Sequence, residues 1–177
     1  MKEKLLSMIP EFNEIQDAEL REKTIAVWEE AMAYRNWTPE ELASIPFTLL
    51  AENVKITFLE HVRTVCRMCI AVDKVLTEAY GDRKTLVNRD YLVAGALLAD
   101  VGKLYEYDKK NGQIVKSKHG RYLRHPFTSV ALCFRHGIPE EVMHVAAVHS
   151  KEGEGFPRSP EAIIFHHADF IDFDLVK

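Results

Sequence analysis

The chain has 177 residues, of which 47% are apolar and 28% are charged, and its formal net charge is -4. This length suits one domain with a sizeable core, and the composition is that of an ordinary soluble globular protein. The charge gives no reason to expect a nucleic-acid polymer or an anionic membrane as a partner, and no segment approaches the roughly 18 apolar residues that span a bilayer.

The cysteines and the N-terminal residues indicate a cytoplasmic protein. The first residues contain too short an apolar run for a signal peptide. Three cysteines form no even disulfide framework, so a reducing compartment is expected. Cys66 and Cys69 form a C-x-x-C pair inside a strong helical pattern, and we interpret them as residues that pack within a helix.

The pattern of caps and apolar residues predicts a chain of helices. An amphipathic helix is expected over about 17–34, and Thr38-Pro39-Glu40-Glu41 starts a short helix that stops before Pro46. A capping box at Thr57 opens a long helix that ends at Gly81. Further helices are expected from Asn88 through the motif near residue 100, and over about 126–136, 139–149 and 160–172.

One segment departs from the helical pattern. Two short β-type runs flank Asn111-Gly112, a strong two-residue hairpin signal, so a small β-hairpin is expected near residues 104–118. The predicted fold is therefore a single all-α domain over 1–177 with a hairpin insertion. Residues 1–50 form an N-terminal helical extension on the core, with Trp28, Trp37 and Phe47 as large apolar residues that could cap a pocket or build a homodimer.

Five residues of metal-ligand type lie at helix ends or beside apolar runs, where a site built from several helices would form. Asp100 follows the apolar run 94–98 and Asp169 follows 163–168, and a buried acid is costly unless it is paired or metal-bound. A two-metal hydrolase needs imidazoles and carboxylates that converge, with one carboxylate bridging the ions. The candidate ligands are His61, Asp100, His125, His149 and Asp169.

The order of these residues, with an apolar helix before Asp100 and a glycine and lysine after it, resembles the HD-domain metal-dependent hydrolase superfamily in its H…HD…H…H…D form. The resemblance implies an HD helical bundle with two divalent metal ions, such as Fe, Mn, Zn, Ni or Co. His61, Asp100 and Asp169 would hold the first ion, His125 and His149 the second, and Asp100 would bridge them. Lys103 matches the lysine that faces the substrate anion in this family, so Asp100 and Lys103 are the expected catalytic residues.

The chain departs from this pattern at Ala99, where the family has the histidine of its His-Asp pair. A methyl group coordinates nothing, so the first ion loses one imidazole and we expect impaired activity. Natural divergence and an engineered His→Ala change would both produce this gap. We favour the engineered change, because every other motif position is present.

The resemblance favours a phosphohydrolase or phosphodiesterase that acts on a small phosphorylated molecule or nucleotide. Residues expected at the substrate are Lys103, Arg124, Lys151 and His167, and Tyr105 and Tyr107 could form one wall of the pocket. Two alternatives remain open: a mixed-valent di-iron HD oxygenase that cleaves a carbon bond, and a non-catalytic HD protein that binds a small molecule. The ligand order does not discriminate among them.

Overall fold

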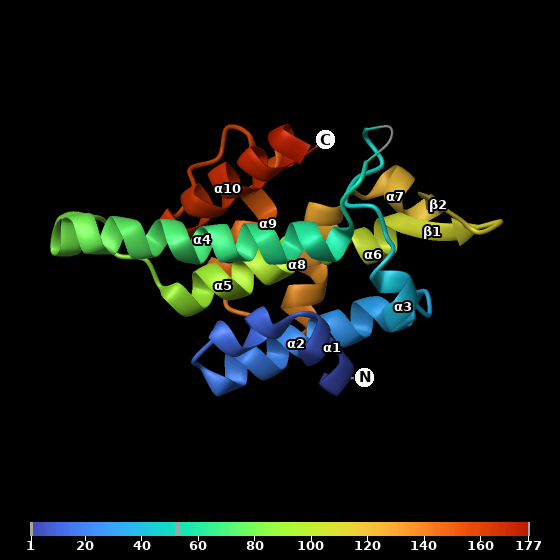
Figure 1. Cartoon of the computed structure of the whole chain (residues 1–177), viewed down its shortest axis with the longest axis horizontal. Helices are drawn as coiled ribbons and strands as arrows, with labels where there is room; N and C mark the ends of the chain where they lie inside the picture. Colours follow the sequence, from blue (N-terminus) through green and yellow to red (C-terminus); the bar gives the residue numbers. More distant parts are fainter. Residues whose placement is uncertain (1, 52–53, 177) are drawn as a thin grey trace.

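A computed structural model describes residues 2–51 and 54–176 of the chain and shows a helical bundle with one small hairpin (Figure 1). The fold is all-α, as predicted. The elements in chain order are α1 (Lys2–Met8), η1 (Pro10–Glu14), α2 (Ala18–Tyr34), α3 (Pro39–Leu42), α4 (Phe58–Tyr80), η2 (Gly81–Arg83), α5 (Arg89–Leu98), α6 (Lys103–Glu106), β1 (Tyr107–Lys110), β2 (Gln113–Lys116), α7 (Lys118–Tyr122), α8 (His125–Arg135), α9 (Glu140–Val148), η3 (Lys151–Gly153) and α10 (Pro160–Val176).

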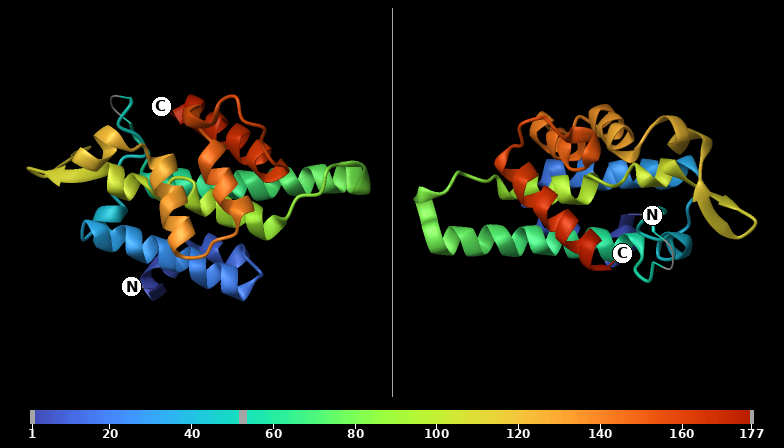
Figure 2. Two further views of the ribbon diagram at one scale, coloured as in Figure 1. Left: turned by 180° about the vertical axis from the view of Figure 1, so that it is seen from behind. Right: turned by 90° about the horizontal axis from the view of Figure 1, so that it is seen from above.

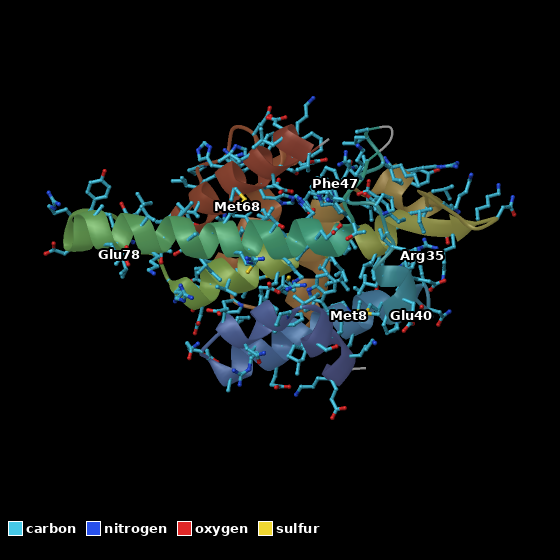
Figure 3. All side chains as sticks on the ribbon, in the orientation of Figure 1. Met8, Arg35, Glu40, Phe47, Met68 and Glu78 are labelled. Atoms are coloured by element: carbon cyan, nitrogen blue, oxygen red, sulfur yellow. The ribbon has the colours of Figure 1, made fainter. Side chains whose placement is uncertain are left out.

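The centre of the bundle is the long helix α4 packed against α5 and α10 (Figure 2). Thr57 and Glu60 form the predicted capping box at its start, and Gly81 ends it with a φ of 56°. Its last turns project beyond the rest of the molecule, and Glu78 marks this end in Figure 3. Cys66 and Cys69 are buried on the inner face of α4, as expected for residues that pack within a helix.

The N-terminal helices α1 and α2 lie on one side of α5, below it in Figure 1, and α3 follows to the right in that view. Two indole groups attach this N-terminal part to the core: Trp28 Nε1 donates to the Leu97 carbonyl and Trp37 Nε1 to the Leu104 carbonyl, both at 2.9 Å. Trp28, Trp37 and Phe47 are all buried within the chain. The prediction that they could supply dimer contacts is therefore wrong, because folding covers the apolar surface that such contacts would use.

The segment around Asp100 is a turn rather than a continuous helix. Helix α5 ends at Leu98, residues 99–102 form the turn, and α6 begins at Lys103. Gly102 allows this turn to approach the start of α8, because a Cβ there would lie 2.3 Å from the His125 carbonyl oxygen. The glycine of the motif is thus required by close backbone packing.

The predicted hairpin is present but shorter than expected. Strands β1 and β2 pair antiparallel with Tyr107 opposite Lys116 and Lys110 opposite Gln113. Asn111 and Gly112 both have positive φ, 52° and 76°, as a two-residue hairpin turn requires. Residues 103–106 belong to α6 instead, and α7 follows the hairpin because the Ser117 side chain accepts a hydrogen bond from Gly120 N and caps it.

The other helices that the sequence predicts, α2, α3, α8 and α9, lie close to their expected positions. Helix α10 extends four residues beyond the expected end at 172, to Val176. Within residues 2–51 and 54–176, no helix combines the length and apolar character needed to cross a membrane.

Candidate metal centre

Five separate elements bring the predicted ligands together in the interior of the bundle. His61 lies in the first turn of α4, Asp100 in the turn after α5, His125 at the first residue of α8, His149 directly after α9, and Asp169 in α10. His61, Asp100, His125 and His149 are buried, and Asp169 is partly exposed. Four of these residues lie at or near helix ends and Asp169 lies within α10, and the packing of α4, α5, α8, α9 and α10 brings them together.

The ligand atoms form two groups that share Asp100. In the first, His61 Nε2 lies 3.1 Å from Asp100 Oδ2 and 3.1 Å from Asp169 Oδ1. In the second, Asp100 Oδ1 lies 3.1 Å from His125 Nε2 and 3.7 Å from His149 Nε2, and the two Nε2 atoms are 3.3 Å apart. Each group places three donor atoms within 4.8 Å of one another, with one Asp100 oxygen in each.

The other nitrogen of each imidazole is held by an acceptor. His61 Nδ1 lies 2.7 Å from Asp172 Oδ2, His125 Nδ1 lies 3.1 Å from Glu106 Oε2, and His149 Nδ1 lies 2.7 Å from the Ala146 carbonyl oxygen. A carbonyl oxygen only accepts, so Nδ1 of His149 carries the proton. Acceptors on Nδ1 orient all three rings with Nε2 toward the centre, which is the arrangement seen around metal-binding histidines.

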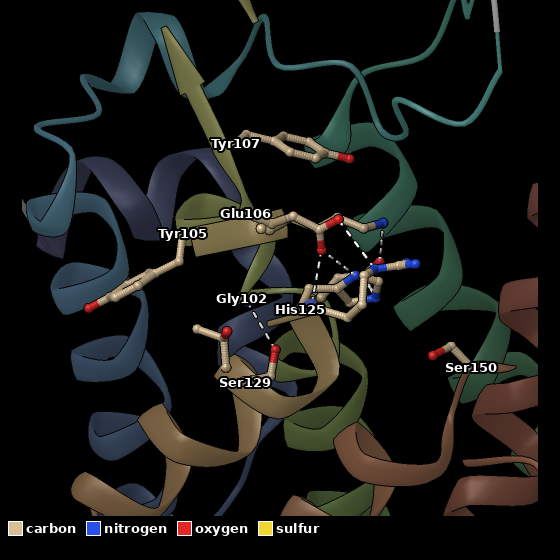
Figure 4. Close-up of polar contacts among 12 residues, drawn as sticks. Gly102, Tyr105, Glu106, Tyr107, His125, Ser129 and Ser150 are labelled. Atoms are coloured by element: carbon tan, nitrogen blue, oxygen red, sulfur yellow. Dashed lines mark hydrogen bonds and ion pairs between the residues drawn. The ribbon is translucent and has the colours of Figure 1, made fainter. Parts of the chain in front are cut away.

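Sequence reasoning missed Glu106 and Asp172. Asp172 follows Asp169 by three residues on α10, a spacing that places both on one helix face and could have signalled a second acid at the site. Glu106 has no such signal, since it approaches His125 through the turn between α6 and the hairpin (Figure 4). Its Oε2 also accepts a hydrogen bond of 2.9 Å from the backbone N–H of His125.

The charges of the centre compensate one another. Burial opposes ionisation of Asp100, but Lys103 and His125 hold its pKa well below the usual range. Burial likewise disfavours a charged His61, but the carboxylates of Asp100, Asp169 and Asp172 raise its pKa to about 10. In the absence of a metal ion, Asp100 is therefore a carboxylate that faces protonated partners.

Lys103 is buried beside the ligands rather than extended into solvent. Its Nζ donates to Asp100 Oδ2 at 2.9 Å and to the Phe47 carbonyl at 3.1 Å. The Tyr107 hydroxyl donates to the same carbonyl at 3.4 Å. Lys103 thus connects the central carboxylate to the loop before α4, where Phe47 is labelled in Figure 3.

A cavity of about 660 Å³ opens over the centre, a size that suits a small organic molecule. Its lining combines apolar and aromatic residues from the loop before α4, the hairpin and α10 with several basic groups. The apolar lining residues include Phe47, Leu49, Leu50, Tyr107, Ile114, Val115, Phe170 and Phe173, and the basic ones are Lys103, Lys116, Arg124 and Lys151. Such a cavity combines anion-binding groups with a surface for an apolar or planar moiety.

Three of the four residues expected at the substrate line this cavity: Lys103, Arg124 and Lys151. His167 does not; it is exposed on α10 outside the cavity. Its neighbour His166 turns toward the centre instead, and its Nδ1 lies 2.6 Å from the His149 carbonyl oxygen. Adjacent helical residues point about 100° apart, so only one of the two can face inward.

The two tyrosines near the hairpin have different positions. Figure 4 shows Tyr107 above the cluster and Tyr105 pointing away from it. Tyr107 lines the cavity, whereas the Tyr105 ring stacks on Tyr34 with centroids 3.6 Å apart. The expectation that both form the pocket wall is therefore correct for Tyr107 and wrong for Tyr105.

A family model described as "HD domain" matches residues 58–174, which contain all five candidate ligands. The chain belongs to the HD domain family. The HD domain begins at α4 and ends in α10, so α1, α2 and α3 precede the matched region.

A curated relative of this HD domain is the dihydroneopterin 2',3'-cyclic phosphate phosphodiesterase of Methanocaldococcus jannaschii. It is 36% identical over 115 residues, which cover 64% of this chain and 45% of the relative. The chain therefore spans less than half the length of this relative. No solved structure shows a significant match.

The donor set of this HD domain fits divalent metal ions. Imidazole nitrogens and carboxylate oxygens together suit Zn, Fe, Co, Ni and Mn. The three Nε2 atoms face Asp100 with their Nδ1 atoms already engaged by acceptors, so Nε2 is the nitrogen that each ring would offer to an ion. At Ala99, which is fully buried, the methyl group offers no donor to either group.

Proposed function

We propose that this HD domain is a metal-dependent phosphodiesterase that hydrolyses a small phosphate ester, with His61, Asp100 and Asp169 in one ligand group and Asp100, His125 and His149 in the other. The observation that carries the proposal is the pair of three-atom groups that share Asp100 beneath a cavity with basic residues in its lining. The relative's activity on a cyclic phosphate points to the same reaction class.

Bound divalent ions supply positive charge to the phosphoryl oxygens and lower the pKa of a water molecule. The net reaction adds one water across a P–O ester bond: the water oxygen joins phosphorus and the ester oxygen leaves with a proton. Asp169 is the most solvent-accessible carboxylate of the ligand groups, with 14% of its side chain exposed against 4% for Asp100. We assign Asp169 the proton that the attacking water gives up.

The basic residues of the cavity act on the anion. Arg124 lines the cavity with Nε 3.3 Å from Glu106 Oε1 and Nη1 3.4 Å from Glu152 Oε1, so two carboxylates orient its guanidinium. Lys151 is exposed and lines the same cavity. Arg124, Lys151 and Lys103 would offset the phosphate charge as it develops.

The experiment is a hydrolysis screen of the full chain, purified without metal and reloaded with Mn²⁺, Co²⁺, Zn²⁺ or Fe²⁺. The substrates are bis(p-nitrophenyl) phosphate and a 2',3'-cyclic nucleotide, and Asp100→Asn is compared with His167→Ala as a matched control outside the cavity. We expect metal-dependent hydrolysis that Asp100→Asn reduces at least about 100-fold and His167→Ala leaves unchanged. No hydrolysis with any of the four ions, in both the present chain and a folded Ala99→His variant, would refute the proposal.

In this proposal, Ala99 lowers the number of imidazole ligands available to the first ion. The first group has one imidazole and two carboxylates, and a histidine at position 99 would add a second imidazole to it. We expect Ala99→His to increase metal-dependent turnover above that of the present chain. Equal turnover in a folded Ala99→His variant would show that the gap at Ala99 does not limit activity.

A second candidate function is oxygen activation at an iron centre. Asp100, His125 and His149 combine two imidazoles with one carboxylate, a donor set found in non-haem iron oxygenases. Oxygen consumption by the iron-loaded protein, together with a mixed-valent electron-paramagnetic-resonance signal, would favour this function over hydrolysis. Metal-dependent phosphodiesterase activity without oxygen uptake would exclude it.

A further inference from the structure

The two ligand groups differ in their electrostatic surroundings. Lys103 Nζ donates at 2.9 Å to Asp100 Oδ2, the oxygen that faces His61. The other oxygen, Oδ1, faces His125 and His149. The Asp100 oxygen of the His61 group therefore already contacts an ammonium ion, whereas within residues 2–51 and 54–176 no lysine is bound to the Asp100 oxygen of the His125 group.

Lys103 is fixed in this position by its surroundings. The side chain is 10% exposed, and its Nζ is also bound to the Phe47 carbonyl at 3.1 Å. The rings of Phe47 and Phe58 lie with their centroids 5.9 Å from Nζ. Moving the ammonium away from Asp100 would break both hydrogen bonds in a buried site, so a cation entering the His61 group meets a like charge that cannot easily withdraw.

The donor atoms of the His125 group are already close to the spacing of a metal site. Ligand atoms about 2.0–2.1 Å from a tetrahedral ion lie about 3.3–3.4 Å from one another. The three separations in this group are 3.1, 3.3 and 3.7 Å. Its two histidine rings are held by Glu106 and by the Ala146 carbonyl, so little reorganisation is needed.

The composition of the groups points in the same direction. The His125 group has two imidazoles and one carboxylate, and the His61 group has one imidazole and two carboxylates. Cobalt, zinc and iron favour imidazole donors, whereas magnesium and manganese accept oxygen-rich sets. Ala99 removes the residue that could have balanced the two groups.

We propose that the two groups bind divalent ions in a fixed order, with the Asp100–His125–His149 group first and the His61–Asp100–Asp169 group second and more weakly, because Lys103 already neutralises the Asp100 oxygen of the second group. This inference shares one premise with the proposed function, namely that the centre binds metal ions. It assigns Lys103 the role of setting the difference in affinity between the groups. Lys103 then acts on metal binding as well as on the substrate anion.

The test is a titration of the metal-free full chain with CoCl₂, followed by calorimetry and by visible absorption. We expect two separate events, the second at least about tenfold weaker than the first. His149→Ala should abolish the first event, and Asp169→Asn should leave it intact and remove the second. Lys103→Met should tighten the second event at least about tenfold, and His167→Ala should match the parent chain in both.

Two events of equal affinity in the parent chain would overturn the inference, and this measurement needs no variant. A first event that is lost in Asp169→Asn and kept in His149→Ala would also overturn it. Circular dichroism of each variant in EDTA verifies that its helices are formed. Cobalt binding is measured without substrate, so failure of the binding order and failure of the phosphodiesterase proposal are separate results.

Discussion

Gly102→Ala tests whether close backbone packing positions the metal centre. The new Cβ would lie 2.3 Å from the His125 carbonyl oxygen and 2.9 Å from both Ser129 N and Ser129 Oγ. An ordinary C···O contact is about 3.3–3.6 Å, so the turn and the start of α8 must separate by about 1 Å. Two of the three contacts are with backbone atoms, which cannot rotate away as a flexible side chain could.

The cost of this separation can be worked out from the contacts. Overpacking of a tight interior costs about 1–3 kcal/mol. The Ser129 hydroxyl accepts from Gly102 N at 2.9 Å and donates to the Ala99 carbonyl at 2.8 Å, and a buried hydrogen bond is worth about 1 kcal/mol. We expect the free energy of unfolding to fall by about 2–5 kcal/mol.

The same displacement affects the ligands, since His125 Nε2 lies 3.1 Å from Asp100 Oδ1. Metal–ligand distances in real sites lie within about 0.2 Å of their usual values, so a shift of about 1 Å should weaken cobalt binding at least about tenfold. The assays are urea unfolding without metal and cobalt calorimetry on the folded variant.

Gly95→Ala is the matched control for Gly102→Ala. Its Cβ would meet the Val145 side chain at 2.9 Å, so it also overpacks the core, but its nearest contacts are with a flexible side chain and include no ligand atom. We expect Gly95→Ala to change stability without changing cobalt affinity. A folded Gly102→Ala protein with the parent's stability and cobalt affinity would refute the packing explanation.

Three further predictions follow from single contacts. Asp172→Asn replaces the carboxylate that orients His61, whose Nδ1 lies 2.7 Å from Asp172 Oδ2. We expect the second cobalt-binding event to weaken about 10–100-fold while the first is unchanged. An equal loss of affinity in both events would contradict the assignment. Trp37→Phe leaves the Leu104 carbonyl without its donor at 2.9 Å and should lower the free energy of unfolding by about 1–3 kcal/mol in urea, with no change in cobalt affinity. In the metal-free protein, the neighbouring carboxylates raise the pKa of His61 from 6.5 to about 10. The protonated His61 therefore stabilises the fold fully below pH 6.5, and this stabilisation is lost as the pH rises toward 10. In EDTA, Tm should fall over that pH range, and it should fall less in His61→Gln.

The sequence by itself determined the helical architecture and the identity of the candidate ligands. Caps and periodicity are local properties, so Thr57, Asn88 and Gly81 marked helix ends that the structure confirms. Asn111-Gly112 marked the hairpin turn for the same reason, because positive φ angles are a property of the residues themselves. The order of histidines and acids around Ala99-Asp100 identified the family that the comparison confirms.

Only the tertiary structure decided which other groups complete the centre. Asp172 and Glu106 orient His61 and His125, and Lys103 binds the Phe47 carbonyl, through contacts between elements far apart in the chain. Packing also placed Tyr105 and His167 outside the cavity although their neighbours Tyr107 and His166 turn toward the centre. A side chain's direction depends on where its helix or strand packs, and no local pattern in the sequence encodes that.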